Sequence, residues 1–241
     1  FKRMLQSMEE QTCQDFELQL NLPRYSVSED IEYEVPDWLG DYNVTVHRCE
    51  EDWGSHTKII PTLQRELDPD TQIIIVDDDY VYHKDLIKRI KYFSKKYPDC
   101  AVGFDGCDTI DPPSQEHPQR GYFRNIYQTL HPMKVKVLKG FKGVFYLRKF
   151  FDDTYYEYAR KCWCDDLVIS CMMGKAGVEK LVCPYVDDTY DGELTEPYFG
   201  TESWNWPIID ALTDYPRSGC NHLRKKQDTR QQRNAAFIEM C

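Results

Sequence analysis

The sequence predicts an α/β fold in which helices flank a sheet. Through the first half of the chain, segments with the two-residue period of a strand alternate with segments whose apolar residues recur at helical spacing. The strongest strand is 73–76, where four consecutive apolar residues, most of them β-branched, are typical of a strand buried on both faces. The clearest helix is 84–97, which is apolar on one face and ends before Pro98.

The other elements follow from the same periods and from their stop signals. The pattern predicts further helices at 1–11, 57–67, 152–160 and 167–173, and further strands at 16–22, 42–47, 101–104, 133–138, 144–147 and 181–185. Pro23 ends the first strand, and Gly174 or Gly177 ends the last helix. Residues 106–119 are rich in proline and predict a loop. Since no internal repeat or low-complexity linker interrupts the chain, we expect a single domain over 1–241.

Composition limits the classes of partner and compartment. The 241 residues carry a net charge of −11, which argues against a nucleic-acid partner and against docking on anionic lipid by charge alone. No apolar run approaches the roughly 20 residues that span a membrane. The 10 cysteines are scattered without a C-x-x-C pair, so we expect mostly reduced thiols in a cytoplasmic protein. The alternative is a secreted protein with several disulfides.

Three aspartates follow the 73–76 strand directly. Adjacent carboxylates at the end of a buried strand repel one another unless a cation neutralises them. Mg²⁺ and Mn²⁺ take oxygen ligands, and Mg²⁺ is commonly held by one or two carboxylates together with substrate phosphates. Because ligands of open α/β sheets bind at the carboxyl ends of strands, this junction predicts a metal site with Asp79 as the first ligand and Asp77 as the second. The alternative is a solvated turn in which one aspartate caps the next helix.

Five segments, in this order and spacing, resemble the glycosyltransferases of the GT-A fold. They are residues 1–18, 54–63, 73–79 with its D-x-D motif, 140–148, and 164–174 with the acidic pair Asp165-Asp166. Within that fold they are similar to the large inverting family whose members make polysaccharides, and to small glycan-building enzymes of large algal viruses. Two features depart from the family. Asn21-Leu22-Pro23-Arg24 replaces its usual acidic residues after the second strand, and no motif for processive polymer synthesis is evident.

The resemblance implies a Rossmann-like, mixed but mainly parallel sheet flanked by helices. Residues of about 1–106 would form the nucleotide-sugar half and those of about 107–241 the acceptor half, with the family's first strand lying upstream of Phe1. The implied activity is the transfer of a single sugar from a nucleotide-sugar donor, a UDP-sugar, to a hydroxyl of a glycan acceptor. The implied cofactor is Mn²⁺ or Mg²⁺, and the anomeric configuration would invert.

The resemblance also suggests residues for the donor. Asp77 or Asp78 would hold the ribose, Lys58 would touch the diphosphate, and His222 would bind the metal or the diphosphate. The alternative for Lys58 is a solvated helix lysine, and for His222 a surface histidine.

Inverting transfer needs a base for the acceptor hydroxyl. Asp165 and Asp166 stand where a loop meets a helix whose dipole favours an ionised carboxylate, and the resemblance makes Asp166 the base. Two capping aspartates are the alternative. Trp204 and Trp206 could stack on acceptor sugars or fill the core.

Two other functions remain open at this point. The chain could be a non-catalytic, transferase-like domain that binds a glycan, which its aromatic C-terminal third would suit. It could also be a metal-dependent nucleotidyltransferase or phosphohydrolase, since these enzymes use clustered aspartates as well. Such an enzyme releases pyrophosphate or phosphate, whereas a glycosyltransferase releases an intact nucleoside diphosphate.

Overall fold

The computed structural model describes residues 1–28, 30–111, 122–127 and 129–184. Its centre is a five-stranded sheet in the order β5-β11-β6-β12-β9. These strands are β5 (Gln72–Ile75), β6 (Cys100–Gly103), β9 (Met133–Lys134), β11 (Val144–Leu147) and β12 (Glu179–Val182). The predicted class, α/β with a mixed sheet flanked by helices, is confirmed for this part of the chain.

The prediction of a mainly parallel sheet is wrong. Strand β11 runs antiparallel to both of its neighbours, β5 and β6, and β9 runs antiparallel to β12. Only β6 and β12 pair in parallel within this sheet. The physical reason is that β11 inserts between β5 and β6, and all four of its residues are buried there. A short apolar run fits either strand direction equally well.

Strands β5, β6 and β12 nevertheless point the same way, because β5 and β6 both oppose β11 and β12 is parallel to β6. Their carboxyl ends therefore meet at one edge of the sheet. Strand β11 begins at this edge, where Val144 pairs with Ile75 on one side and Gly103 on the other. The edge thus collects the aspartates after β5 and the 3-10 turn η3 (Gly140–Lys142) that precedes β11.

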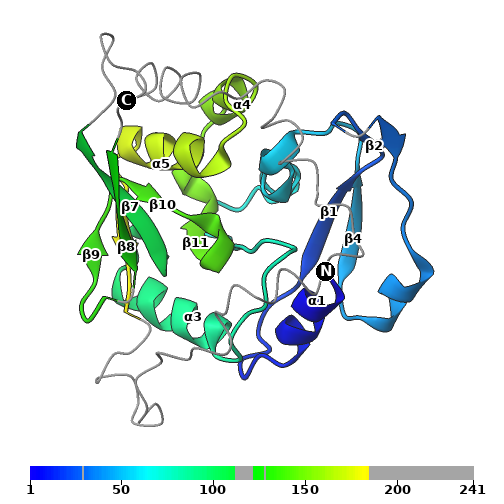
Figure 1. The fold of residues 1–241 in the computed structure, drawn as a ribbon, viewed down its shortest axis with the longest axis horizontal. Coiled ribbons are helices and arrows are strands. Elements are labelled where there is room, and N and C mark those ends of the chain that lie inside the picture. The colour runs from blue at the N-terminus through cyan, green and yellow to red at the C-terminus, as the bar shows by residue number, and fades with distance from the viewer. Residues whose placement is uncertain (29, 112–121, 128, 185–241) are drawn as a thin grey trace.

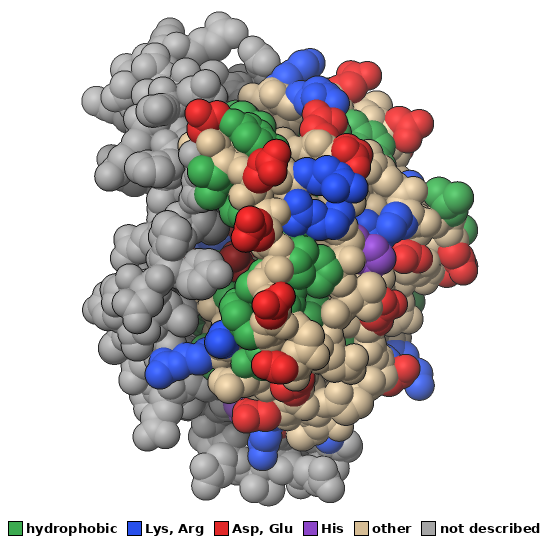
Figure 2. Space-filling model, turned by 90° about the vertical axis from the view of Figure 1, so that its right-hand side faces the viewer, with side chains coloured by type: hydrophobic (Ala, Val, Ile, Leu, Met, Phe, Trp, Pro, Cys, Tyr) green, Lys and Arg blue, Asp and Glu red, His purple; other side chains and the backbone are tan. Residues whose placement is uncertain are grey.

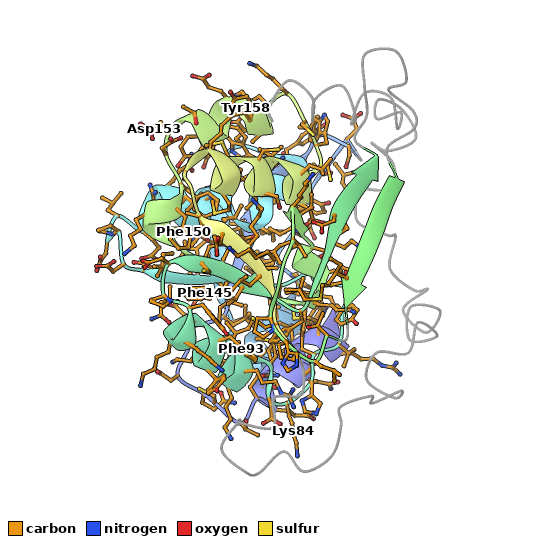
Figure 3. The ribbon with its side chains drawn as sticks, turned by 90° about the vertical axis from the view of Figure 1, so that its left-hand side faces the viewer. Lys84, Phe93, Phe145, Phe150, Asp153 and Tyr158 are labelled. Atoms are coloured by element: carbon orange, nitrogen blue, oxygen red, sulfur yellow. The ribbon has the colours of Figure 1, made fainter. Side chains whose placement is uncertain are left out.

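Helices cover both faces of the sheet (Figure 1). On one face lies α3 (Leu86–Lys96), which buries Leu86, Ile87, Ile90 and Phe93 as its amphipathic pattern predicts. On the other lie α4 (Thr154–Ala159) and α5 (Asp165–Lys175), and α5 is buried along most of its length. Figure 3 shows this layering through Phe93 of α3, Phe145 of β11 and Tyr158 of α4.

A second, three-stranded sheet in the order β10-β7-β8 lies beside the first. It contains β7 (Asp105–Asp111), β8 (Tyr122–Tyr127) and β10 (Val137–Leu138). The loop predicted at 106–119 is therefore wrong up to Asp111, because β7 is a polar strand without apolar alternation and its prolines begin only after it ends. The strand predicted at 133–138 is split between β9 and β10, which belong to different sheets.

The N-terminal part adds a parallel pair, β1 (Gln19–Pro23) with β4 (Thr45–Cys49), and a small hairpin, β2 (Tyr25–Ser26) with β3 (Ile31–Glu32). Acidic and basic side chains lie interspersed on this side of the molecule (Figure 2). The helix α1 (Lys2–Glu9) is tied to the segment before α3, because Ser7 Oγ accepts from the Tyr82 N–H at 3.0 Å. After β4 come η2 (Gly54–Lys58) and α2 (Ile60–Arg65), where the sequence predicted one helix.

Within the described residues, no helix is both long and apolar enough to cross a membrane.

Gly143, which directly precedes β11 at this edge, should tolerate a side chain poorly. Its φ is +86°, and an added Cβ would stand 3.0 Å from Leu86 Cδ1 on α3. Gly143→Ala is expected to lower the free energy of unfolding by about 1–3 kcal/mol, because an L-residue is strained at positive φ and the contact is crowded. Urea denaturation measures this, with Gly40→Ala as the control, since a Cβ there meets nothing within 4 Å. Equal stability of the two variants would contradict the geometry.

Candidate active site

Lys58 is the centre of the site. This residue ends η2, and its Nζ lies 2.5 Å from Asp77 Oδ1 and 3.0 Å from Asp165 Oδ2. Asp77 follows β5 and Asp165 opens α5, so one ammonium joins two distant parts of the chain at the carboxyl edge of the sheet. All three side chains are mostly buried, with 23%, 25% and 11% of their surface exposed. The alternative of a solvated helix lysine is therefore wrong.

The start of α5 aims two carboxylates into the site. Cys164 is the N-cap residue, with an extended backbone, and Asp165 and Asp166 form the first turn. Asp165 points at Lys58, while Asp166 Oδ1 accepts a hydrogen bond of 2.8 Å from the Gly140 N–H in η3. An added Cβ on Gly140 would stand 3.3 Å from that same oxygen. Both aspartates thus contact other elements, which differs from the alternative in which they only cap the helix.

Burial and charge give the two neighbouring carboxyls different proton affinities. Burial and the charge of Asp165 raise the pKa of Asp166 to about 7, although Lys58 and the Gly140 N–H oppose this. Burial also raises the pKa of Asp165, but the Lys58 ammonium outweighs burial and holds it below its usual range. In turn the carboxylates raise the pKa of Lys58 well above its ordinary value despite burial. Near neutral pH, Lys58 and Asp165 form a fixed ion pair and Asp166 can exchange a proton.

Tyr82 ties the aspartate motif to η3. Its hydroxyl accepts from the Asp77 N–H at 2.7 Å and lies 2.9 Å from the Phe141 main-chain oxygen, to which it donates. Tyr80 packs its ring against both Tyr82 and Phe141. Sequence reasoning missed Tyr82, and its only signal is its place just after the aspartates. The tyrosine fixes where the backbone leaves the sheet and so where Asp77 points.

Asp105, the first residue of β7, is a second residue that the sequence did not indicate. It is buried, and its carboxylate lies 2.7 Å from Lys142 Nζ and 3.3 Å from Lys139 Nζ. Both lysines belong to the η3 region, so this pairing anchors the backbone that carries Gly140. Asp105 therefore holds η3 in place through its two lysine partners.

The residues suited to a divalent cation are few. Among the residues that the structure describes, no three His, Cys, Asp or Glu side chains are grouped to hold a metal ion. Asp77 is engaged by Lys58, whereas Asp78 and Asp79 lie exposed in the turn after β5. One or two carboxylates with phosphate oxygens are the usual ligands of Mg²⁺, so Asp79 suits a cation that arrives with a phosphorylated substrate.

The structure therefore brings together Lys58, Asp77, Asp165 and Asp166, and it places Asp78 and Asp79 beside them. His222, Trp204 and Trp206 lie outside the described residues.

Neither the scan against protein-family models nor the search of curated proteins finds a match for this chain.

Proposed function

We propose that this chain is a glycosyltransferase of the GT-A type. It moves a single sugar from a nucleotide-sugar donor, a UDP-sugar, to a hydroxyl of a glycan acceptor, with inversion at the anomeric carbon. The observation that carries the proposal is the meeting of Asp77, Lys58 and Asp165 beside Asp166, whose pKa lies at about 7. A buried cation next to a carboxyl poised near neutrality suits a reaction that releases an anion and accepts a proton.

Lys58 is assigned to the donor diphosphate. An ammonium has three N–H donors, and two of these point to Asp77 and Asp165. The third can reach a phosphate oxygen of the leaving group, where negative charge grows in the transition state. Asp78 is assigned to the ribose hydroxyls, and Asp79 with the diphosphate oxygens to Mn²⁺ or Mg²⁺. When bound, the cation supplies further positive charge to the leaving diphosphate.

Asp166 is assigned as the base that takes the acceptor proton. The Gly140 N–H orients one carboxylate oxygen at 2.8 Å and leaves the other for the acceptor hydroxyl. Asp165 is less suited, because its ion pair with Lys58 lowers its pKa and so weakens it as a proton acceptor.

The pH dependence of turnover follows from this assignment. The base must be ionised, so the rate of donor turnover is expected to fall as the pH drops through about 7, the pKa of Asp166. If Asp165 were the base instead, its lowered pKa would leave the rate flat over the same range. Initial rates measured from about pH 5 to about pH 9 separate the two. A flat profile over this range would contradict the assignment of Asp166.

Donor binding tests the proposal directly. Calorimetric titration of the chain with UDP is expected to detect binding that Mn²⁺ strengthens, and Asp79→Asn is expected to remove the effect of the metal while the protein stays folded. A chain that binds no UDP, GDP or dTDP sugar with or without the metal would exclude this function.

A further inference from the structure

A joint of several contacts connects η2 to the loop that enters α5. The Ser55 hydroxyl donates a hydrogen bond to the main-chain oxygen of Trp163, and His56 Nε2 lies 2.8 Å from the main-chain oxygen of Cys162. Gly54, at φ +59°, lies so close to the Trp163 ring that no Cβ could be accommodated. Three successive residues of η2 are thus fixed to the two residues that precede the N-cap of α5.

His56 is the buried centre of this joint. Its side chain has no exposed surface, and its Nδ1 lies 2.8 Å from the Tyr155 hydroxyl on α4. Because a main-chain carbonyl only accepts, Nε2 carries the proton and Nδ1 accepts from Tyr155. Burial lowers the pKa of His56, so the ring stays neutral in this one tautomer near pH 7. The two ring nitrogens therefore fix η2 to α4 and to the entry of α5 at the same time.

The residues of this joint lie just before both members of the Lys58–Asp165 ion pair in the sequence. Lys58 is the second residue after His56, and Asp165 is the third after Cys162. Both ends of the Lys58–Asp165 contact, 3.0 Å long, are therefore carried by segments that His56 holds together. A long, flexible lysine side chain loses rotamer entropy when it is held between two carboxylates, so a fixed backbone on both sides favours the pair.

We propose that His56 is a positioning residue that keeps Lys58 against Asp165 through its two hydrogen bonds, and so leaves Asp166 as the carboxylate that takes the acceptor proton. The positioning stands on the geometry alone, and only the consequence for Asp166 rests on the proposed function. An apolar residue of similar volume would fill the space but would leave the Tyr155 hydroxyl and the Cys162 carbonyl without these bonds.

Four variants separate positioning from packing. His56→Leu removes both hydrogen bonds, whereas His56→Gln offers an amide that can donate to Cys162 and accept from Tyr155. Tyr155→Phe removes only the hydroxyl and leaves the ring. His131→Gln is the control, because His131 is exposed and far along the chain from the joint.

The first readout needs no substrate. It is the ¹³C resonance of the Asp165 carboxyl, assigned by its loss in Asp165→Asn and titrated from about pH 4.5 to about pH 8, above the usual range of an aspartate. The wild type is expected to stay ionised, because Lys58 holds the pKa of Asp165 below its ordinary value. In His56→Leu, burial without a close Lys58 should raise this pKa into the titrated range. His56→Gln and His131→Gln should behave as the wild type.

Titratable and polar groups of several elements surround the carboxyl of Asp165. Their effects on its pKa must stay the same in every variant that is titrated. They are His56 and Lys58 with the Ser55 hydroxyl on η2, Asp77 after β5, Tyr146 on β11, Tyr155 on α4, and Asp166 and Cys164 at the start of α5. Burial raises the pKa values of the Tyr146 and Tyr155 hydroxyls and of the Cys164 thiol well above their ordinary values. These three groups therefore stay neutral during the titration.

The second readout is donor turnover. His56→Leu is expected to lose about 10²-fold, the cost of a misplacement of about 1 Å, and His56→Gln to recover most of this loss. The inference is overturned if His56→Leu matches the wild type in both readouts, or if His56→Gln performs no better than His56→Leu. Should His56→Leu not fold, Tyr155→Phe decides, with a smaller shift of the Asp165 titration expected and no shift contradicting the proposal. If the wild type turns over no nucleotide sugar, the proposed function fails while the titration still decides on His56.

Discussion

Asp166→Asn is expected to lower sugar transfer by about 10²–10⁴-fold, the usual contribution of a positioned base, while the affinity for the donor nucleotide stays unchanged. Asparagine keeps the oxygen that accepts from the Gly140 N–H, so the geometry of η3 and α5 is preserved. It cannot accept the proton of an acceptor hydroxyl. Steady-state kinetics with calorimetric donor binding measures both quantities, and the exposed Asp99→Asn is the matched control.

The pH dependence of the stability of Asp166→Asn, compared with that of the wild type, tests the raised pKa of Asp166 independently of activity. Burial places the pKa of Asp166 at about 7 in the folded chain, above the ordinary value of 3.8. The protonated form is therefore favoured by folding, and the associated stability is lost as the pH rises from about 4 through about 7. At pH 8, Asp166→Asn should be at least as stable as the wild type. Near-normal turnover in Asp166→Asn together with a loss in Asp165→Asn would move the base to Asp165.

Lys58→Met is expected to have the largest effect, because it removes the one ammonium that two buried carboxylates share. Leaving a buried charge without its partner costs up to about 3–5 kcal/mol of stability. This cost applies to Lys58 and its two aspartates, because only 11% to 25% of the surface of each side chain is exposed. Donor turnover should fall below detection, since the charge that we assign to the donor diphosphate is lost as well. Urea denaturation and donor binding measure the two effects.

The matched control for this loss is Lys149→Met. Lys149 also pairs with an aspartate, at 2.9 Å from Asp70, but both side chains of that pair are exposed. Exposed pairs contribute little because water screens them, so this variant should keep its stability and turnover. A similar, small effect of Lys58→Met and Lys149→Met would mean that Lys58 is not the centre of the site.

The junctions that carry the carboxylates were predictable from the sequence, for physical reasons. An apolar run followed by Asp77 predicts a buried strand with charge at its end, and Asp165-Asp166 before an apolar helix predicts a first turn. Helix α3 was equally clear from its apolar face. In each case the signal lies within a few neighbouring residues.

What the sequence did not predict depends on contacts between distant segments. The direction of β11 follows from its neighbours, since a run such as Val144–Leu147 pairs equally well either way. Strand β7 is polar, and it is a strand because it pairs with β8. Tyr82 and His56 act through hydrogen bonds to Phe141 and to Tyr155 and Cys162, and no local pattern marks a residue for such a role.

The most direct test of the account is the product released from a panel of nucleotide sugars in the presence of Mn²⁺ or Mg²⁺. We expect that one donor is slowly hydrolysed without acceptor to the free sugar and an intact nucleoside diphosphate, with inverted anomeric configuration by NMR. Asp166→Asn should lower the rate of this reaction by about 10²–10⁴-fold. Release of pyrophosphate or inorganic phosphate, or the absence of turnover for every donor by the folded wild-type chain, would contradict it.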